Sequence, residues 1–120
     1  MKIFRINEQE LTEKILTLLS FASKAKKLVY GKENIREYIK RRKLIIISSD
    51  SGRRVKRDVF KRCDIFNCDV LILENVDKEA LAKKLGMANL SVIGVDDQGI
   101  LDGIIKVVER GGASGKIESV

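Results

Sequence analysis

The chain has 120 residues, of which 44% are apolar and 34% are charged, and it contains no histidine. This length suits one domain with a core of its own, and the composition is that of a folded globular domain rather than a disordered chain. No apolar run approaches the roughly 18 residues of a membrane-spanning helix, and the start MKIFRINEQE lacks the apolar stretch of a secretory signal. We therefore expect no membrane association and a cytoplasmic location.

The charge is unevenly distributed along the chain. Lysine and arginine number 24 against 17 aspartate and glutamate residues, which gives a net charge of +7. Residues 24–62 hold 15 basic and 4 acidic residues, whereas the rest of the chain holds 9 basic and 13 acidic ones. A basic segment between acidic ones predicts one positive face and a polyanionic partner, with nucleic acid the first candidate. The alternative is a set of solvated helix faces rich in lysine.

The first predicted element is a helix. Asn7 followed three residues later by Glu10 is typical of a helix start, and apolar residues three and four apart continue to about Lys24. The run KLVY, residues 27–30, then predicts a short strand that ends at Gly31.

A second, shorter helix follows, because Ile35, Tyr38 and Ile39 have helical spacing. Residues 44–50, LIIISSD, predict a strand covered on both faces, since its consecutive apolar residues leave no polar side. Asp50 or Ser51 is expected to cap a third helix. The inner face of that helix is expected to carry Val55, Val59, Cys63 and Phe66.

The remaining sequence continues the alternation of strand and helix. Residues 69–75, DVLILEN, and 91–97, SVIGVDD, predict two further buried strands. Asp77 begins a helix between them, and Gly86 stops it. The last predicted helix contains Leu101, Ile104, Ile105 and Val108 and ends at the glycine pair 111–112.

This order predicts an α/β protein with helices on both faces of a central sheet of about four strands. No linker or fixed-period repeat divides the chain, so we expect a single domain over residues 1–110. The remaining residues 111–120, GGASGKIESV, are small and polar and predict a flexible tail.

Patterns for catalysis and metal binding are missing from the sequence. Cys63 and Cys68 are two ligands where a structural zinc needs four, and no histidine completes the set. The segment SSDSG matches neither the G-x-S-x-G nor the Walker pattern, and the neighbouring Asp96 and Asp97 are expected to point apart and cap the next turn. We therefore expect no enzyme activity, no cofactor and no metal, and two buried thiols.

The start of the second helix suits nucleic acid. Gly31 permits a sharp turn that exposes the first backbone N–H groups of the helix to a phosphate. Glu33 and Asn34 can bond base edges, or they can merely stabilise the helix start. Lys27 and Lys32 are expected to hold the flanking phosphates, and Arg36 and Lys40 to extend the positive surface. With only four phenylalanines and two tyrosines, stacking of several bases on exposed rings is not expected.

The segments LLSFASKAKKLVYGKENIREYIKRRKLIIISSD, LAKKLGM and SVIGVDD together resemble the L-seven-Ae/L-thirty-e superfamily of ribosomal and RNA-binding proteins. The likeness covers residues 10–108 and is closest to the small bacterial members of the YlxQ type. Its most specific part is the basic step from Lys27 through Gly31 into a helix, followed by the apolar strand 44–47 and Asp50.

The resemblance implies a three-layer α-β-α sandwich with a mixed sheet. It also implies a non-catalytic, monomeric protein that binds a kink-turn, an RNA helix bent beside tandem sheared G·A pairs, often in the ribosome. Two segments match the family's RNA contacts: the helix start Gly31, Lys32, Glu33 and Asn34, and the loop Gly86, Met87, Ala88 and Asn89.

The sequence departs from the family pattern at the helix start, where Glu33 precedes Asn34, and at Glu37, where lysine is common. Three hypotheses follow. The first is a protein that binds ribosomal or other structured RNA. The second is a protein-interaction module with the same fold and basic face. The third is an enzyme acting on a small anionic substrate, which requires a pocket with perturbed acids.

Overall fold

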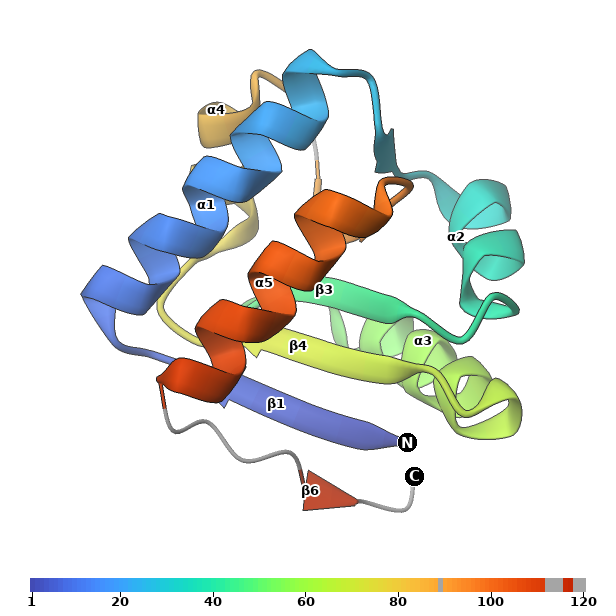
Figure 1. The fold of residues 1–120 in the computed structure, drawn as a ribbon. Coiled ribbons are helices and arrows are strands. Elements are labelled where there is room, and N and C mark those ends of the chain that lie inside the picture. The colour runs from blue at the N-terminus through green and yellow to red at the C-terminus, as the bar shows by residue number, and fades with distance from the viewer. Residues whose placement is uncertain (89, 112–115, 118–120) are drawn as a thin grey trace.

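The computed structural model describes residues 1–88, 90–111 and 116–117 (Figure 1). The strands are β1 (Lys2–Ile6), β2 (Leu28–Val29), β3 (Leu44–Ser48), β4 (Asp69–Leu73), β5 (Val92–Val95) and β6 (Lys116–Ile117). The helices are α1 (Gln9–Lys24), α2 (Lys32–Ile39), α3 (Arg53–Phe66), α4 (Lys78–Leu85) and α5 (Gln98–Arg110). Strands and helices alternate in the predicted order, which confirms the α/β class.

The six strands form one mixed sheet in the order β2-β5-β3-β4-β1-β6. Neighbours β3, β4 and β1 run parallel, while β5 is antiparallel to β3, β2 to β5, and β6 to β1. The sheet has two more strands than the four expected. One of the two additional strands is β1, the short segment KIFRI. It pairs with β4, and its residues Ile3 and Ile6 are buried there.

Helices cover both faces of the sheet, so the molecule has the expected three layers. Figure 1 shows α1 and α5 across one face, with α3 behind the strands on the other. Helices α1, α4 and α5 pack on the first face, and α2 and α3 pack on the second. Alternate side chains of β3 serve the two cores: Leu44 and Ile46 face the first, and Ile45 and Ile47 the second.

Two predicted helix starts were wrong. Glu8, not Asn7, is the N-cap of α1, and Gly52, not Asp50 or Ser51, is that of α3. The carboxylate of Asp50 instead accepts a hydrogen bond from the Lys78 amide at 2.7 Å, which supports the start of α4. Sequence spacing cannot anticipate this bond, because it joins residues that only the folded chain brings together.

Other predicted helix ends are confirmed. The Asp77 carboxylate caps α4 by accepting from the Ala80 amide at 2.7 Å, and that of Asp97 caps α5 by accepting from the Ile100 amide at 2.9 Å. Gly86 ends α4 in the left-handed conformation, with φ of 69°.

The inner face of α3 is narrower than predicted. Val59 and Cys63 are buried and Phe66 is half-buried, but Val55 is exposed. Cys63 and Cys68 are both fully buried free thiols. The hydrogen bond between them, followed by burial, raises the pKa of Cys63 far above its usual value.

Part of the predicted tail is structured. Lys116–Ile117 pairs with Lys2 and Ile3 as β6, whereas residues 112–115 and 118–120 lie outside the described residues. Across the described part of the chain, no helix combines the length and the apolar character needed to cross a membrane.

Candidate nucleic-acid interface

The start of α2 is an exposed helix end. Gly31 precedes the helix with φ of 88°, a conformation that favours glycine, and its nearest neighbour in the direction of a side chain is Asn34 Nδ2 at 4.0 Å. Gly31 has no side chain to cap the helix, and residues 31–34 are all exposed. The first backbone N–H groups of α2 therefore face solvent with the partial positive charge of a helix N-terminus.

The amide of Asn34 has a role within the protein. Its Nδ2 donates a hydrogen bond to the carbonyl oxygen of Tyr30 at 3.1 Å, which braces the turn at Gly31. The second Nδ2 hydrogen and the carbonyl oxygen stay available, since Asn34 is exposed. Both readings of Asn34, as a stabiliser of the turn and as a contact to a base, are compatible with this geometry.

The four cations predicted at the site differ in their surroundings. Lys27 and Lys32 are exposed and form no ion pair with a described residue. Lys40 pairs with Glu37 at 3.1 Å, and Arg36 with Asp58 of α3 at 3.8 Å. The Nε atom of Arg36 is buried and has no hydrogen-bond partner in the described part of the chain, which is unusual in a folded protein.

A groove of about 550 Å³ runs between α2, α3 and the start of β5; we call it the α2–α3 groove. Its floor is apolar, formed by residues such as Ile35, Ile39 and Val59, and cations stand at its edges. It is lined by Tyr30, Gly31, Lys32, Ile35, Arg36, Ile39, Arg54, Val55, Asp58, Val59, Arg62, Leu90, Ser91 and Val92.

The lining of the α2–α3 groove includes residues of one predicted contact segment and residues that follow the other. Gly31 and Lys32 lie at the start of α2, and Leu90 and Ser91 lie at the end of the loop after α4. Gly86 and Met87 begin this loop: the amide of Gly86 donates to the Lys83 carbonyl at 3.3 Å, and that of Met87 to the Ala82 carbonyl at 2.8 Å.

The remaining predicted loop residues have different environments. Met87 is half-buried against the core and Ala88 is exposed. The predicted contact Asn89 lies outside the described residues. Lys27 contributes through its backbone, where its carbonyl oxygen accepts from the Asp96 amide at 2.7 Å and fixes the chain just before β2.

Sequence reasoning missed Tyr30, Arg54 and Arg62 as groove residues. Tyr30, whose ring is exposed, stands directly before the predicted Gly31 turn, and this position is the signal in the sequence that could have indicated it. The arginines belong to the basic run RRVKRDVFKR, whose charge is part of the basic segment 24–62 and whose sequence does not indicate a place at the site. Only packing of α3 beside α2 brings them to the groove.

The α2–α3 groove is lined by both apolar and charged side chains. Asp58, the one acid among its described lining residues, pairs with Arg36 and also with Arg62 at 3.4 Å. Among the described residues, no group of three or more cysteines and acids could hold a metal ion. An apolar floor with arginine and lysine edges suits a ligand that combines flat apolar rings with negative charge.

No protein-family model matches this chain, and no curated protein matches it in sequence. Its fold, however, matches solved structures. A protein of unknown function from Bacillus halodurans is 26% identical, with a TM-score of 0.69, over 80% of this chain and 97% of that one. The 15.5 kD RNA-binding protein of Giardia lamblia is 16% identical, with a TM-score of 0.70, over 88% of this chain and 92% of that one.

These likenesses define the class of fold to which the chain belongs, a three-layer α-β-α sandwich. The fold implied by the sequence resemblance is therefore confirmed. The Giardia protein, which is described as binding RNA, is the more informative of the two.

Proposed function

We propose that this chain is a non-catalytic protein that binds structured RNA through the α2–α3 groove and the adjoining start of α2. The observation that carries the proposal is that four features lie together: uncapped helix amides, Lys32 without an ion pair among the described residues, the arginines of α3, and the end of the loop after α4. Phosphates are bound by helix N-termini and by basic side chains, and bases by apolar and aromatic surfaces. The shared fold of the Giardia RNA-binding protein supports the same conclusion.

The finer form of the proposal is a kink-turn as ligand. A kink-turn presents phosphates beside exposed base edges at a sharp bend, which matches a helix end flanked by a groove. In this arrangement Lys27 and Lys32 hold phosphates, and Glu33 and Asn34 meet base edges. We place the protein among the YlxQ-type members, as a monomer in the cytoplasm that associates with ribosomal RNA.

The test is a titration of a kink-turn RNA and of a straight duplex of equal length. We expect the kink-turn to bind more tightly, because only its bend presents phosphates and base edges to the helix end and the groove together. Replacing Lys32 by Gln and Asn34 by Ala together should weaken kink-turn binding by about 2–4 kcal/mol, the sum of one phosphate and one base contact.

Lys106→Gln is the matched control, because Lys106 is an exposed lysine of α5 on the other face of the sheet. It should leave the affinity unchanged. Unchanged affinity in the double variant would remove the site from α2. Equal binding of both RNAs would limit the proposal to structured RNA in general. Binding of neither, with capture of an acidic protein that survives nuclease treatment, would favour an interaction module instead.

A further inference from the structure

The aromatic ring of Phe21 is exposed although it belongs to a helix with a well-buried face. Ile15, Leu19 and Ala22 of α1 face the core, whereas the Phe21 side chain is 55% exposed. Phe21 and Tyr30 are the two exposed aromatic residues in the described part of the chain. Tyr30 lines the α2–α3 groove, so the exposure of Phe21 calls for a separate explanation.

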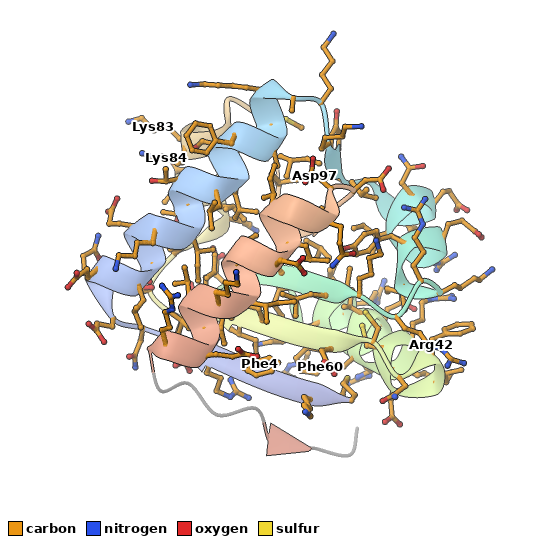
Figure 2. All side chains as sticks on the ribbon, viewed as in Figure 1. Phe4, Arg42, Phe60, Lys83, Lys84 and Asp97 are labelled. Carbon is orange, nitrogen blue, oxygen red and sulfur yellow. The ribbon has the colours of Figure 1, made fainter. Side chains whose placement is uncertain are left out.

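Phe21 lines a second groove, of about 540 Å³, between α1 and the end of α4; we call it the α1–α4 groove. Figure 2 shows two of its residues, Lys83 and Lys84, beside the C-terminal half of α1. Among the described residues, its lining consists of Thr17, Ser20, Phe21, Ser23, Lys24, Lys83, Lys84, Leu85 and Gly86.

The α1–α4 groove carries positive charge that no acidic residue of its described lining neutralises. Its three lysines, Lys24, Lys83 and Lys84, form no ion pair with a described residue, and none of the lining residues that the structure describes is acidic. Each lysine lies in the last turn of its helix, where positive charge stabilises the helix dipole. That effect explains the lysines, but it does not explain an exposed ring among them.

The hydroxyl groups that line the α1–α4 groove already donate hydrogen bonds to backbone carbonyls of the protein. Thr17 Oγ1 donates to the Glu13 carbonyl at 2.9 Å, Ser20 Oγ to that of Leu16 at 2.9 Å, and Ser23 Oγ to that of Leu85 at 3.0 Å. A ligand therefore meets mainly an aromatic face and ammonium groups. Such a surface stacks a nucleobase and holds its phosphates without reading the identity of the base.

The loop after α4 connects the two grooves. Gly86, its first residue, lines the α1–α4 groove, and Leu90 and Ser91, near its end, line the α2–α3 groove. An RNA seated at the α2–α3 groove and over this loop therefore extends towards Phe21. Lys26 and Lys27, both exposed, lie in the connection from α1 to β2 and continue the positive charge between the two sites.

We infer that the α1–α4 groove is a second RNA subsite, which stacks one unpaired nucleotide on Phe21 and holds its phosphates with Lys24, Lys83 and Lys84. The inference rests on the proposed function, because the same RNA occupies both grooves. The subsite is tolerant of sequence and favours adenine over uracil, since a larger ring overlaps more of the phenyl face.

The test uses a kink-turn RNA with blunt ends and four derivatives, each with five unpaired adenosines at one of the four strand ends. In fluorescence anisotropy titrations we expect at least one derivative to bind about tenfold more tightly than the blunt RNA. Phe21→Ala should abolish this gain and leave the affinity for the blunt RNA unchanged. Phe21→Tyr should keep the gain, because the tyrosine ring also stacks.

Ile65→Ala is the matched control, because Ile65 is an apolar side chain of α3 with 66% exposure. It should change neither affinity. The inference is overturned if no extension adds affinity, or if Phe21→Ala weakens the blunt and extended RNAs equally. Because Phe21 is exposed, its replacement does not threaten the core, and a thermal melt verifies the fold of the variant.

A crosslinking experiment separates this inference from the proposed function. A photoreactive 5-iodouridine within an oligoadenosine strand should crosslink to the tryptic peptide 15–24, in which Phe21 is the single aromatic residue. The crosslink should disappear in Phe21→Ala. If the wild type binds no kink-turn, the proposed function fails, but this crosslink still supports the subsite. Absence of the crosslink together with absence of an extension effect removes the subsite while the α2–α3 groove can remain.

Discussion

Gly94 of β5 lies directly beneath the ring of Tyr38. A side-chain carbon at this position would approach Tyr38 Cε1 to 2.5 Å, closer than real carbon contacts allow. The ring cannot move aside easily, because Tyr38 is fully buried and its hydroxyl donates to the carbonyl oxygens of Leu44 at 3.1 Å and Val95 at 3.3 Å. Glycine is therefore required here for space, whereas Gly31 is required for its positive φ.

Gly94→Ala should accordingly lower the free energy of unfolding by about 1–3 kcal/mol, the usual cost of overpacking a core. Urea denaturation measures this loss. The control is Gly99→Ala in the first turn of α5, where the nearest atom is Asp97 Oδ1 at 3.4 Å and alanine favours the helix by up to about 1 kcal/mol. Equal stability of the Gly94 variant and the wild type would show that α2 can shift away from β5.

The buried hydroxyl of Tyr38 makes stability depend on pH. Burial raises the pKa of Tyr38 above its ordinary value of 10.0, although the bonds to Val95 and Leu44 act in the opposite direction. The folded state thus favours the neutral phenol. Its contribution is fully present below pH 10 and is lost as the pH rises through the pKa of the folded state.

Tyr38→Phe should therefore destabilise the protein by about 1 kcal/mol at pH 7, the net value of one hydrogen bond. The difference in unfolding free energy between variant and wild type should narrow above pH 10. Urea denaturation at both pH values measures it, and the comparison cancels the contribution of the two cysteines. A difference that stays constant up to pH 11 would contradict the raised pKa.

At the scale of elements, Asp58 ties α2 to α3. Its carboxylate meets Arg36 of α2 at 3.8 Å and Arg62 of its own helix at 3.4 Å. These atoms are partly exposed, so the pairs contribute little to stability, at most about 1 kcal/mol. The same carboxylate is the one negative charge in the lining of the α2–α3 groove and opposes an anionic ligand.

Asp58→Asn should therefore bind RNA more tightly than the wild type, by about two- to fivefold at low salt, because it removes a repulsive charge and frees two arginines. The measurement is a kink-turn titration at two salt concentrations, and the advantage should shrink at the higher one. Weaker binding by Asp58→Asn would mean that Asp58 itself contacts the ligand or must orient Arg36.

At the scale of the whole molecule, the charge is concentrated in one layer. Most cations of the basic segment 24–62 belong to α2, α3 and the connections around them, which lie against one face of the sheet or at its edge, whereas Lys24 ends α1 on the other face. Figure 2 shows Arg42 at that side of the molecule, remote from Lys83 and Lys84 near α1. A layer of this kind attracts a polyanion over a distance and releases counterions when it binds.

RNA affinity should consequently fall steeply with salt, with a log–log slope of about 0.7–0.9 for each phosphate neutralised. Four to six phosphates in the α2–α3 groove would give a slope of roughly −3 to −5. Lys32→Gln should reduce its magnitude by about one, and Lys106→Gln should not. A slope near zero would contradict binding through phosphates and would favour an uncharged ligand.

Much of the fold could be predicted from the sequence because each signal is local. Helix periodicity, the glycine stop at Gly86 and the aspartate caps at Asp77 and Asp97 depend on neighbours within a few residues. β1 was not predicted because buried and more exposed side chains alternate over only five residues, which is too short a pattern to distinguish a strand from an irregular chain end. β6 was not predicted because it is defined only by its pairing with β1, which lies more than one hundred residues earlier in the chain.

The candidate site likewise combines features that the sequence predicts with features that only the folded structure shows. The sequence by itself determined the α/β architecture, the exposed glycine-led start of α2 and the concentration of positive charge, since all three follow from local pattern and composition. The tertiary structure alone decided which cations are paired with acids, that Tyr30 and the arginines of α3 share a groove, and that Phe21 stands exposed among lysines. The physical reason is that a surface site is a set of neighbours in space, and only the packing of helices on the sheet makes neighbours of residues far apart in the chain.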